Sequence, residues 1–333
     1  MSDESQHERE LGGQLLASVS RSFYLTLKAL PKELREPISL AYLLARTADT
    51  VADTAAVPAE LRIECLDDLE KLIMNPDEAV QERLTARINA DFTTRQSDEA
   101  ERRLMERFSE GLAWLRTMQG ASLNAIQQVL QRIIHGQRLD IRRFPADGTL
   151  RCLQSADELD EYTWLVAGCV GEFWTEMCAL EKPASLSQTV TLEQMKSWGA
   201  RFGKGLQLIN ILRDLGEDLQ DGRCYLPGFN AEDVRRNPQL LQPAWKQWLH
   251  TCREHLECGL RYLQHVEDGK LRYATSLPLL IGVKTLGRME KASWHNLLQG
   301  VKVSRLDVAM ILAEAALACR NPEALEHLYR KLA

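Results

Sequence analysis

Apolar residues recur at steps of three and four along almost the whole chain, as they do in amphipathic and buried helices. No region alternates apolar and polar residues convincingly enough to predict a strand. Proline and glycine gather at residues 144–148, 181–183 and 221–243, which predicts loops but no linker between domains. We therefore expect an all-α fold in a single domain over residues 1–333. Helices are predicted near residues 8–19, 32–54, 58–74, 98–118, 122–140, 156–180, 191–218, 243–267, 272–298, 304–318 and 322–331.

Two acidic segments interrupt the apolar pattern. Asp49 and Asp53 lie four residues apart, and Asp214 and Asp218 repeat that spacing. Side chains at this spacing share one face of a helix, where like charges repel. Mg²⁺ relieves such repulsion, because it takes oxygen ligands and bridges carboxylates to substrate phosphates. Two such faces opposed across a cavity would hold Mg²⁺ ions and a diphosphate.

Each acidic pair belongs to a polar stripe on a helix that is otherwise apolar and therefore predicted to be buried. The stripes consist of Tyr42, Arg46, Asp49 and Asp53, and of Gln207, Asn210, Asp214, Glu217 and Asp218. Buried charges need partners or a metal, so the alternative is a structural polar network, such as an ion-pair cluster around Arg46. Two unrelated networks of the same composition are less expected than one shared site, which favours metal–diphosphate chemistry.

Two further segments combine aromatic residues with glycines. Residues 198–205 contain Gly199, Gly203 and Gly205, and residues 162–171 contain Gly168 and Gly171. A glycine inside a helix costs about 1 kcal/mol relative to alanine. Either close helix packing or room for a bulky ligand explains residues 198–205, and the pattern alone leaves both explanations open. The pattern of residues 162–171 predicts a core helix.

Composition narrows the class of protein. The 333 residues carry a formal net charge of −6, so no basic excess indicates nucleic-acid binding. The polar, acidic N-terminus does not read as a signal peptide, and the longest uncharged stretch, residues 273–283, is too short for a membrane span of about 20 residues. The eight cysteines form no Cys-x-x-Cys pair, which suits reduced core thiols. We expect a cytoplasmic protein that is soluble or peripheral to the inner membrane.

The chain resembles the squalene/phytoene synthase family, the head-to-head prenyl diphosphate synthases. Ser20-Arg21-Ser22-Phe23 is similar to the family's N-terminal motif, and the two acidic stripes are similar to its two aspartate-rich motifs. Residues 162–171 and the segment from Gly222 to Pro227 also match family segments in the same order. The first motif departs from the squalene synthase pattern, because Ala52 and Thr54 stand where further acids are usual.

The resemblance implies an all-α isoprenoid synthase fold with a central cavity and a prenyltransferase of the farnesyl-diphosphate farnesyltransferase type. Tyr162, Tyr42 and Arg213 would act at the reacting centre, where an aromatic face can stabilise a carbocation. The residues expected to bind Mg²⁺ are Asp49, Asp53, Asn210, Asp214, Glu217 and Asp218. Those expected to bind the diphosphate of farnesyl diphosphate are Arg21, Ser20, Arg46, Arg223 and Gln207, with Arg213 assisting.

Family members differ in whether they use a reductant. Residues 300–305 resemble a basic segment that squalene synthases associate with the nicotinamide nucleotide, which makes Lys302 and Arg305 candidates for NADPH binding. Residues 136–140 and 225–227 look closer to the phytoene branch. We favour squalene synthase over phytoene or dehydrosqualene synthase. A terpene cyclase and a non-enzymatic helical scaffold are less favoured. Any membrane contact would be peripheral, serving product release.

Overall fold

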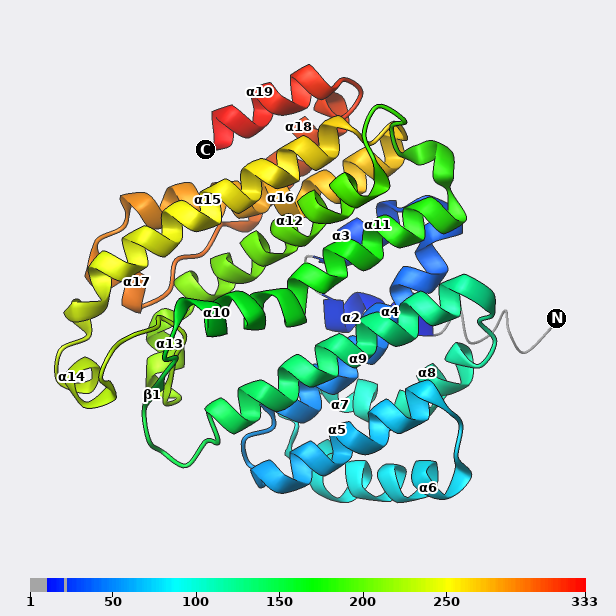
Figure 1. The fold of residues 1–333 in the computed structure, drawn as a ribbon, viewed down its shortest axis with the longest axis vertical. Helices are drawn as coiled ribbons and strands as arrows, with labels where there is room; N and C mark the ends of the chain where they lie inside the picture. The colour runs from blue at the N-terminus through cyan, green and yellow to red at the C-terminus, as the bar shows by residue number, and fades with distance from the viewer. Residues whose placement is uncertain (1–10, 21–22) are drawn as a thin grey trace. The chain divides into compact units, whose positions relative to one another are not determined.

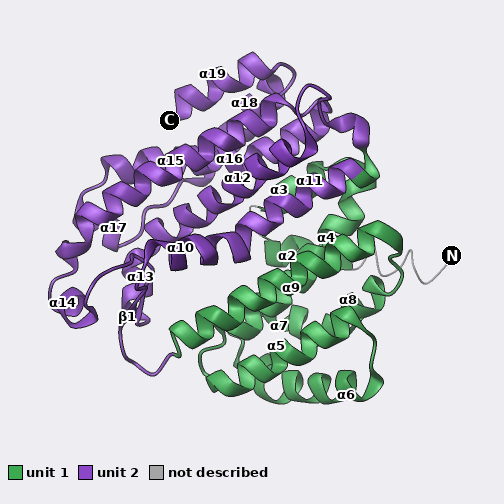
Figure 2. Cartoon of the chain, viewed as in Figure 1, with its two compact units in different colours: residues 1–145, 180–182 green, residues 146–179, 183–333 purple. Residues whose placement is uncertain are grey.

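The computed structural model describes residues 11–20 and 23–333, shown as a ribbon in Figure 1. Its described residues fall into two compact units, coloured separately in Figure 2. The first unit comprises residues up to 145 together with 180–182, and the second comprises residues 146–179 and 183–333. Helices make up nearly all of both units, so the predicted all-α class is confirmed.

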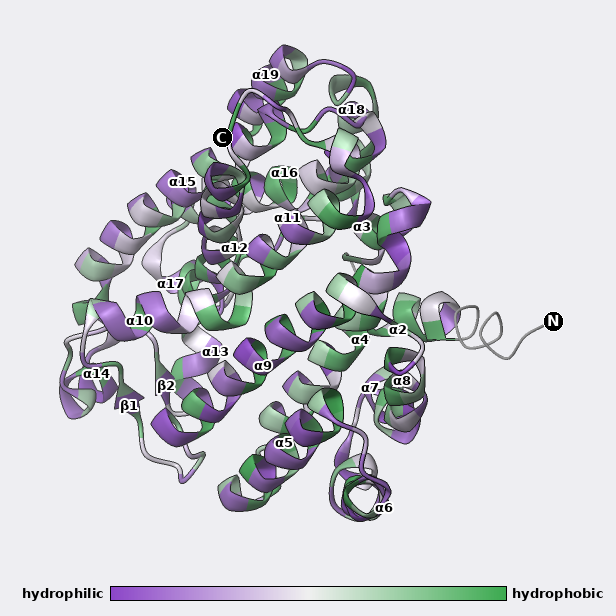
Figure 3. Ribbon diagram, turned by 45° about the vertical axis from the view of Figure 1, so that its right-hand side comes forward, coloured by the Kyte–Doolittle hydropathy of each residue, from purple (hydrophilic) through white to green (hydrophobic). Residues whose placement is uncertain are grey.

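The first unit is built around a group of three helices, in which α4 (Lys32–Asp53), α5 (Ala59–Met74) and α9 (Gly120–Arg143) all contact one another. Hydrophobic and hydrophilic residues lie on different sides of α5 and α9 (Figure 3), which is why these helices bury one side only. The remaining α-helices of this unit are α2 (Leu16–Ser20), α3 (Phe23–Ala29), α6 (Glu78–Arg87), α7 (Glu99–Glu106) and α8 (Phe108–Leu115).

The second unit is organised around α12 (Leu192–Arg213), α15 (Gln242–Gln264) and α16 (Gly269–Lys291), which lie side by side (Figure 1). A π-helical turn, Trp164–Gly168, joins α10 (Ala156–Thr163) to α11 (Cys169–Glu181) and packs on α12. The shorter elements are α13 (Leu215–Gln220), α14 (Ala231–Arg236), α17 (Trp294–Leu298), α18 (Arg305–Ala318), α19 (Pro322–Leu332), β1 (Arg151–Cys152) and β2 (Arg223–Cys224).

Several predicted boundaries are wrong. The expected helix at 191–218 divides at Asp214, whose φ of −94° and ψ of 9° are not helical. The expected helix at 98–118 divides at Arg107, and the one at 272–298 ends at Lys291, because Ser293 caps a new helix. Helices α3, α6 and α14 were not predicted as separate elements. An apolar period carries across such local breaks, so it does not reveal them.

The pair of strands was also not predicted. β1 and β2 are parallel, with Arg151 opposite Arg223 and Cys152 opposite Cys224. The amide of Arg151 donates to the carbonyl of Gly222 at 2.9 Å. Each strand has only two residues, and so short a segment shows no recognisable alternation of apolar and polar residues. The pairing matters because it holds Arg223 in extended backbone directly after the second acidic motif.

Glycines let α11 and α12 approach within backbone contact. A Cβ atom placed on Gly171 would lie 1.9 Å from the carbonyl oxygen of Gly199, and one on Gly203 would lie 2.1 Å from that of Ala167. No real Cβ contact is that short, so these positions admit no larger residue without movement of a helix. Close packing therefore explains these glycines, and nothing about them requires a ligand.

Among residues 11–20 and 23–333, no helix is both long enough and apolar enough to span a membrane. All eight cysteines are buried as free thiols. Burial raises the pKa of Cys65 to about 11 and that of Cys178 to about 12, so both remain protonated at neutral pH.

We predict that Gly171→Ala destabilises the protein by about 3 kcal/mol or more, because the added methyl group would overlap backbone atoms of α12. Gly269→Ala is the matched control, since no atom lies within 4 Å of its Cβ position in the first turn of α16. Chemical denaturation with urea measures both. The packing account is contradicted if the two variants unfold at the same urea concentration.

Candidate active site

The first acidic motif lies on the last turns of α4. Leu43, Leu44, Ala48 and Val51 are buried and fix the orientation of this helix. Asp49 and Asp53 are left on the other side, with Asp49 partly exposed and Asp53 exposed. The structure thus keeps both carboxylates on an accessible stripe, as their spacing predicts.

Asp49 belongs to a four-residue network that spans three helices. Arg46 forms ion pairs with Asp49 on its own helix and with Glu101 on α7. The buried Gln137 on α9 donates from Nε2 to Asp49 Oδ1 at 2.9 Å. A purely structural cluster would also contain the Arg46–Asp49 pair. The pair alone therefore does not decide between a metal–diphosphate site and a structural polar network.

Burial raises the pKa of the Asp49 carboxyl, against the opposing effects of the Arg46 guanidinium and the Gln137 amide. Burial alone would lower the pKa of Arg46, but Asp49 and Glu101 more than compensate and raise it, so the guanidinium stays charged. Desolvation of the Asp49 carboxylate therefore has a cost, and a bound cation would reduce that cost.

Glu101 and Gln137 were not predicted as site residues. Glu101 follows Arg46 by 55 positions and sits in a polar helix, where nothing in the pattern distinguishes it from its acidic neighbours. Gln137 could have been recognised as a candidate from the sequence, because it is a polar residue among the buried positions Ile133, Ile134 and Ile141 of α9.

The other predicted residues of the first unit lie near the start of the chain and on α4. Tyr42 stacks on Phe23 with ring centroids 5.3 Å apart, and its hydroxyl donates to the carbonyl of Val19 at 3.4 Å. The hydroxyl of Ser20 donates to the carbonyl of Leu16, one turn earlier in α2. Arg21 lies outside the described residues.

The second acidic motif spans the joint between α12 and α13. Although the helix breaks at Asp214, the amide of Asp218 donates to the carbonyl of Asp214 at 2.9 Å, so the i, i+4 spacing survives. Arg213 pairs with both oxygens of Asp214, its Nε donating at 2.7 Å. This hydrogen bonding raises the pKa of Arg213. One turn earlier on α12, Asn210 donates to Gln207 at 3.4 Å. Asn210 and Glu217 are exposed.

Arg223, on β2, pairs with the other aspartate of the second motif, Asp218. Its Nη2 atom donates to Asp218 Oδ1 at 2.9 Å and to Asp221 Oδ2 at 3.1 Å. Asp218 is more buried than Asp221, with 13% of its side chain exposed. In each motif, acids expected to bind metal are thus neutralised by arginines expected to bind diphosphate.

The basic C-terminal segment is fixed next to the second motif. A Cβ atom on Gly216, between Asp214 and Glu217, would lie 1.8 Å from the carbonyl oxygen of Leu298, so α17 packs directly on α13. The chain continues through residues 299–304, where the Lys302 carbonyl accepts a hydrogen bond from Arg288 Nη1 at 2.7 Å. Lys302 and Arg305 themselves are exposed.

Tyr162 is the second-last residue of α10 and lies beside the π-helical turn at Trp164–Gly168. Such turns are frequent at functional sites. The ring of Tyr162 stacks on Tyr225, with centroids 5.0 Å apart and planes 19° from parallel. Both rings are more than nine-tenths buried. Tyr225 was recognised only as part of a family segment, and the stacking brings its ring against that of Tyr162.

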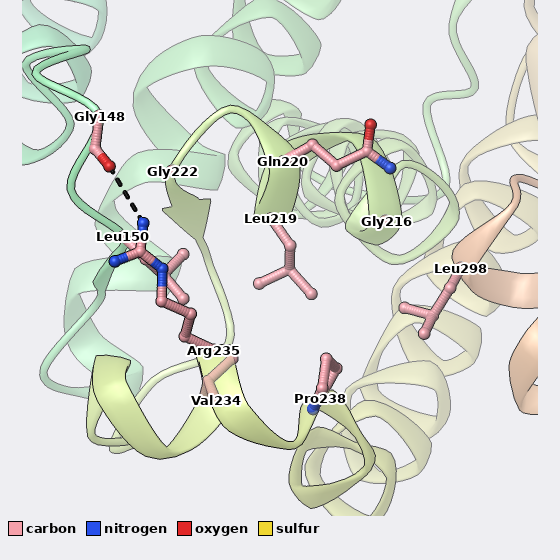
Figure 4. A pocket seen from close by; sticks show the side chains of 10 residues that line it. All are labelled: Gly148, Leu150, Gly216, Leu219, Gln220, Gly222, Val234, Arg235, Pro238 and Leu298. Carbon is pink, nitrogen blue, oxygen red and sulfur yellow. Dashed lines mark hydrogen bonds between the residues drawn. The ribbon is translucent and has the colours of Figure 1, made fainter.

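A cavity of about 290 Å³ lies against Gly216, Leu219 and Gln220 of α13 and is also lined by Leu298, Val234 and Arg235 among others. Figure 4 shows these residues. Arg235 donates to the carbonyl of Gly148 at 3.4 Å. None of the predicted site residues lines this cavity, so we do not assign it to the acidic motif.

Carboxylate and amide oxygens of the kind found on these faces suit Mg²⁺, which usually takes one or two protein carboxylates and completes its shell with water and phosphate. Among the described residues, no three His, Cys, Asp or Glu side chains are grouped closely enough to hold a metal ion. The two carboxylates of each motif fit a cation that shares its remaining ligands with a diphosphate.

Residues 16–307 match the squalene/phytoene synthase family, and the chain belongs to that family. A squalene synthase of Gibberella zeae is 26% identical over 307 residues, covering 89% of this chain and 61% of the relative. The Saccharomyces cerevisiae squalene synthase is 28% identical over 257 residues, 77% and 53% of the two chains. A bifunctional lycopene cyclase/phytoene synthase of Phaeosphaeria nodorum is 26% identical over 227 residues, 66% and 35% of the two chains.

Solved structures agree on the fold. A ligand complex of TcSQS superposes with a TM-score of 0.75 at 20% identity, covering 98% of this chain and 90% of that chain. The squalene synthase HpnC of Alicyclobacillus acidocaldarius gives a TM-score of 0.58 at 18% identity, covering 87% and 96%. The fold is therefore the all-α isoprenoid synthase fold, as expected from the resemblance. The chain spans 61% of the length of the Gibberella zeae squalene synthase and 53% of that of the Saccharomyces cerevisiae enzyme.

We predict that Asp49→Asn leaves the fold intact and raises the free energy of unfolding near neutral pH. The folded-state pKa of Asp49 is raised above its ordinary value of 3.8, so the folded protein binds the proton more tightly than the unfolded chain does. The stability contributed by this group is therefore lost as pH rises from 3.8 through the raised pKa. The advantage of the variant should appear at neutral pH and disappear as pH falls toward 3.8.

Thermal unfolding without added metal, at pH values from about 4 to about 8, measures this difference. Asp157→Asn is the control, at an exposed position in the first turn of α10. An Asp49→Asn variant that is less stable than the parent at neutral pH would show that the carboxylate is a net stabilising partner of Arg46.

Proposed function

We propose that this protein is a squalene synthase, a prenyltransferase that condenses two farnesyl diphosphates head to head and then reduces the product with NADPH. The first step gives presqualene diphosphate and the second gives squalene. The proposal combines family membership with the geometry of the two acidic motifs and of the segment that follows α17.

The acidic motifs would bind Mg²⁺ through Asp49 and Asp53 in the first and through Asp214 and Asp218 in the second, with Asn210 and Glu217 assisting. Mg²⁺ would supply neutralisation of the departing diphosphate. Binding of cations to the carboxylates would release their arginine partners. Arg46, Arg213 and Arg223 could then form the bidentate hydrogen bonds to phosphate oxygens for which a planar guanidinium is suited. Ser20, Gln207 and Arg21 are further proposed diphosphate ligands.

The stacked pair of Tyr162 and Tyr225 would form one wall of the reacting centre. An aromatic face stabilises a nearby cation, most strongly where water is excluded. The phenol of Tyr162 could in addition hold or pass a proton. Tyr42, stacked on Phe23, is the corresponding aromatic candidate in the first unit.

The contact between Gly216 and Leu298 is the single observation that favours a reductive enzyme. The contact puts Leu298, two residues before the basic segment, against the helix that carries Glu217 and Asp218. Exposed cations at Lys302 and Arg305 would then be available for the phosphates of NADPH. A synthase of the phytoene or dehydrosqualene type, which releases its product unreduced, remains the second candidate because a phytoene synthase is among the relatives.

We predict that purified protein with farnesyl diphosphate, Mg²⁺ and NADPH forms squalene, and that omitting NADPH stops the reaction at presqualene diphosphate or diverts it to unreduced products. Replacing Lys302 and Arg305 together by alanine should raise KM for NADPH at least about tenfold, the loss of roughly 1.4 kcal/mol of binding. Presqualene diphosphate formation should be unchanged. Product analysis and initial rates provide both readouts.

Lys291→Ala combined with Arg236→Ala is the matched control, since it removes the same two charges from exposed positions on α16 and α14. Equal yields of a hydrocarbon with and without NADPH would instead place the protein in the dehydrosqualene or phytoene branch. Equal KM values for NADPH in the two double variants would remove Lys302 and Arg305 from the site.

A further inference from the structure

Two buried cysteines face each other across the parallel pair of strands. Cys152 is the last residue of β1, Cys224 is the last residue of β2, and the two are partners in the register. The strands lie side by side in Figure 3. Neighbouring strands are about 4.8 Å apart, and the Cα atoms of a disulfide are usually about 4.4 to 6.8 Å apart. The backbone therefore already gives the two cysteines the spacing of a disulfide.

The side chains of this pair also meet. A hydrogen bond joins the thiol of Cys152 to that of Cys224. Cys224 is completely buried, whereas 8% of Cys152 is exposed. Other buried thiols bond to oxygen instead: Cys252 donates to a backbone carbonyl, and Cys319 shares a hydrogen bond with a serine hydroxyl. The contact between two sulfur atoms thus calls for an explanation that burial alone does not give.

The two thiols differ in reactivity. Hydrogen bonding to Cys224 lowers the pKa of Cys152, whereas hydrogen bonding to Cys152 and burial both raise the pKa of Cys224. The thiolate is the nucleophile in cysteine chemistry. Cys152, which is also the more exposed of the two, is therefore the thiol that reacts first with a small oxidant.

We propose that Cys152 and Cys224 form an oxidative modification site, at which hydrogen peroxide converts the two facing thiols into a disulfide. Peroxide is small enough to reach a sulfur that is only slightly exposed. The modification is reversible, because a dithiol reductant returns both cysteines to thiols. It closes the chain between residues 152 and 224 with a covalent bond.

The reaction takes place in two steps. The Cys152 thiolate attacks one oxygen of the peroxide and breaks the O–O bond, which leaves a sulfenic acid on Cys152. The departing hydroxide takes up the thiol proton and becomes water. The Cys224 sulfur then attacks the Cys152 sulfur, an S–S bond replaces the S–O bond, and the second hydroxide leaves as water with the proton of Cys224. Two thiols have lost two electrons, and one peroxide has been reduced to two waters.

The disulfide reinforces a pairing that is otherwise held by few bonds. The amides of Arg151 and Leu153 donate to the carbonyls of Gly222 and Cys224 at 2.9 and 3.0 Å. Strands this short provide little stability of their own. A bond between their last residues fixes the backbone of Arg223 beside the second acidic motif. The inference does not rest on the proposed function, because the disulfide forms without substrate or metal.

Peptide mapping of the folded protein tests the inference. The protein is treated with hydrogen peroxide, its remaining thiols are blocked with N-ethylmaleimide, and it is digested without reductant. We expect mass spectrometry to find peptides joined through Cys152 and Cys224, and dithiothreitol to separate them. In the oxidised protein, the amides of Arg151 and Leu153 should exchange with deuterium at least about tenfold more slowly, because local opening of the strands is restricted.

Variants test the roles of the two sulfur atoms. Cys224→Ser should stop at the sulfenic acid, so that dimedone labels Cys152, whereas Cys152→Ser should leave Cys224 unlabelled. Cys258→Ala is the matched control, since it removes a buried thiol of α15 and leaves the pair in place. It should form the same link as the parent.

The proposal is overturned if peroxide gives no link between Cys152 and Cys224 in the folded parent, or if the link forms only after unfolding in urea. It is also overturned if dimedone labels Cys224 in Cys152→Ser as strongly as it labels Cys152 in Cys224→Ser.

Discussion

The pairing of arginine with carboxylate in the acidic motifs is the interaction on which the account of this protein depends. Arg46 pairs with Asp49, Arg213 with Asp214, and Arg223 with Asp218. Without these pairs, carboxylates four residues apart on a largely buried helix would repel one another. The same pairs would set the proposed chemistry, because any cation that took the carboxylates would leave an arginine available for an anion. Binding of Mg²⁺ and of diphosphate is thus expected to be coupled through the pairs.

The surrounding structure holds the second motif in place through its backbone. The helix break at Asp214 lets Arg213 reach both oxygens of its neighbour, and the pairing of β1 with β2 positions Arg223 against Asp218. Gly216 gives α13 room to lie against Leu298. α11 packs closely on α12, so the segment that bears Tyr162 is held against the helix that leads into this motif. These features explain why glycines accompany the charged residues: they allow contacts at backbone distance that any side chain would prevent.

Much of this could be predicted from the sequence, and the exceptions have physical causes. The carboxylates of α4 are on one stripe as expected, because helical periodicity depends only on local spacing. The break at Asp214 is hidden because apolar residues continue in phase on both sides of it. Glu101 and Tyr225 reach their partners Arg46 and Tyr162 only through tertiary packing, which no spacing along the chain reveals. Close packing at Gly199 could be offered only as one of two explanations until the neighbouring backbone of α11 at Gly171 was in place.

The central claim is that the second acidic motif exchanges arginine for Mg²⁺ and so creates a diphosphate site. Isothermal titration calorimetry with inorganic pyrophosphate, with and without Mg²⁺, tests it most directly. The account predicts that Mg²⁺ strengthens pyrophosphate binding and that pyrophosphate strengthens Mg²⁺ binding by the same factor, as linkage requires. It further predicts that Asp214→Asn abolishes this coupling. Pyrophosphate that binds equally well without Mg²⁺, or coupling that survives in Asp214→Asn, would contradict the account and leave the ion pairs as structural elements of the helices.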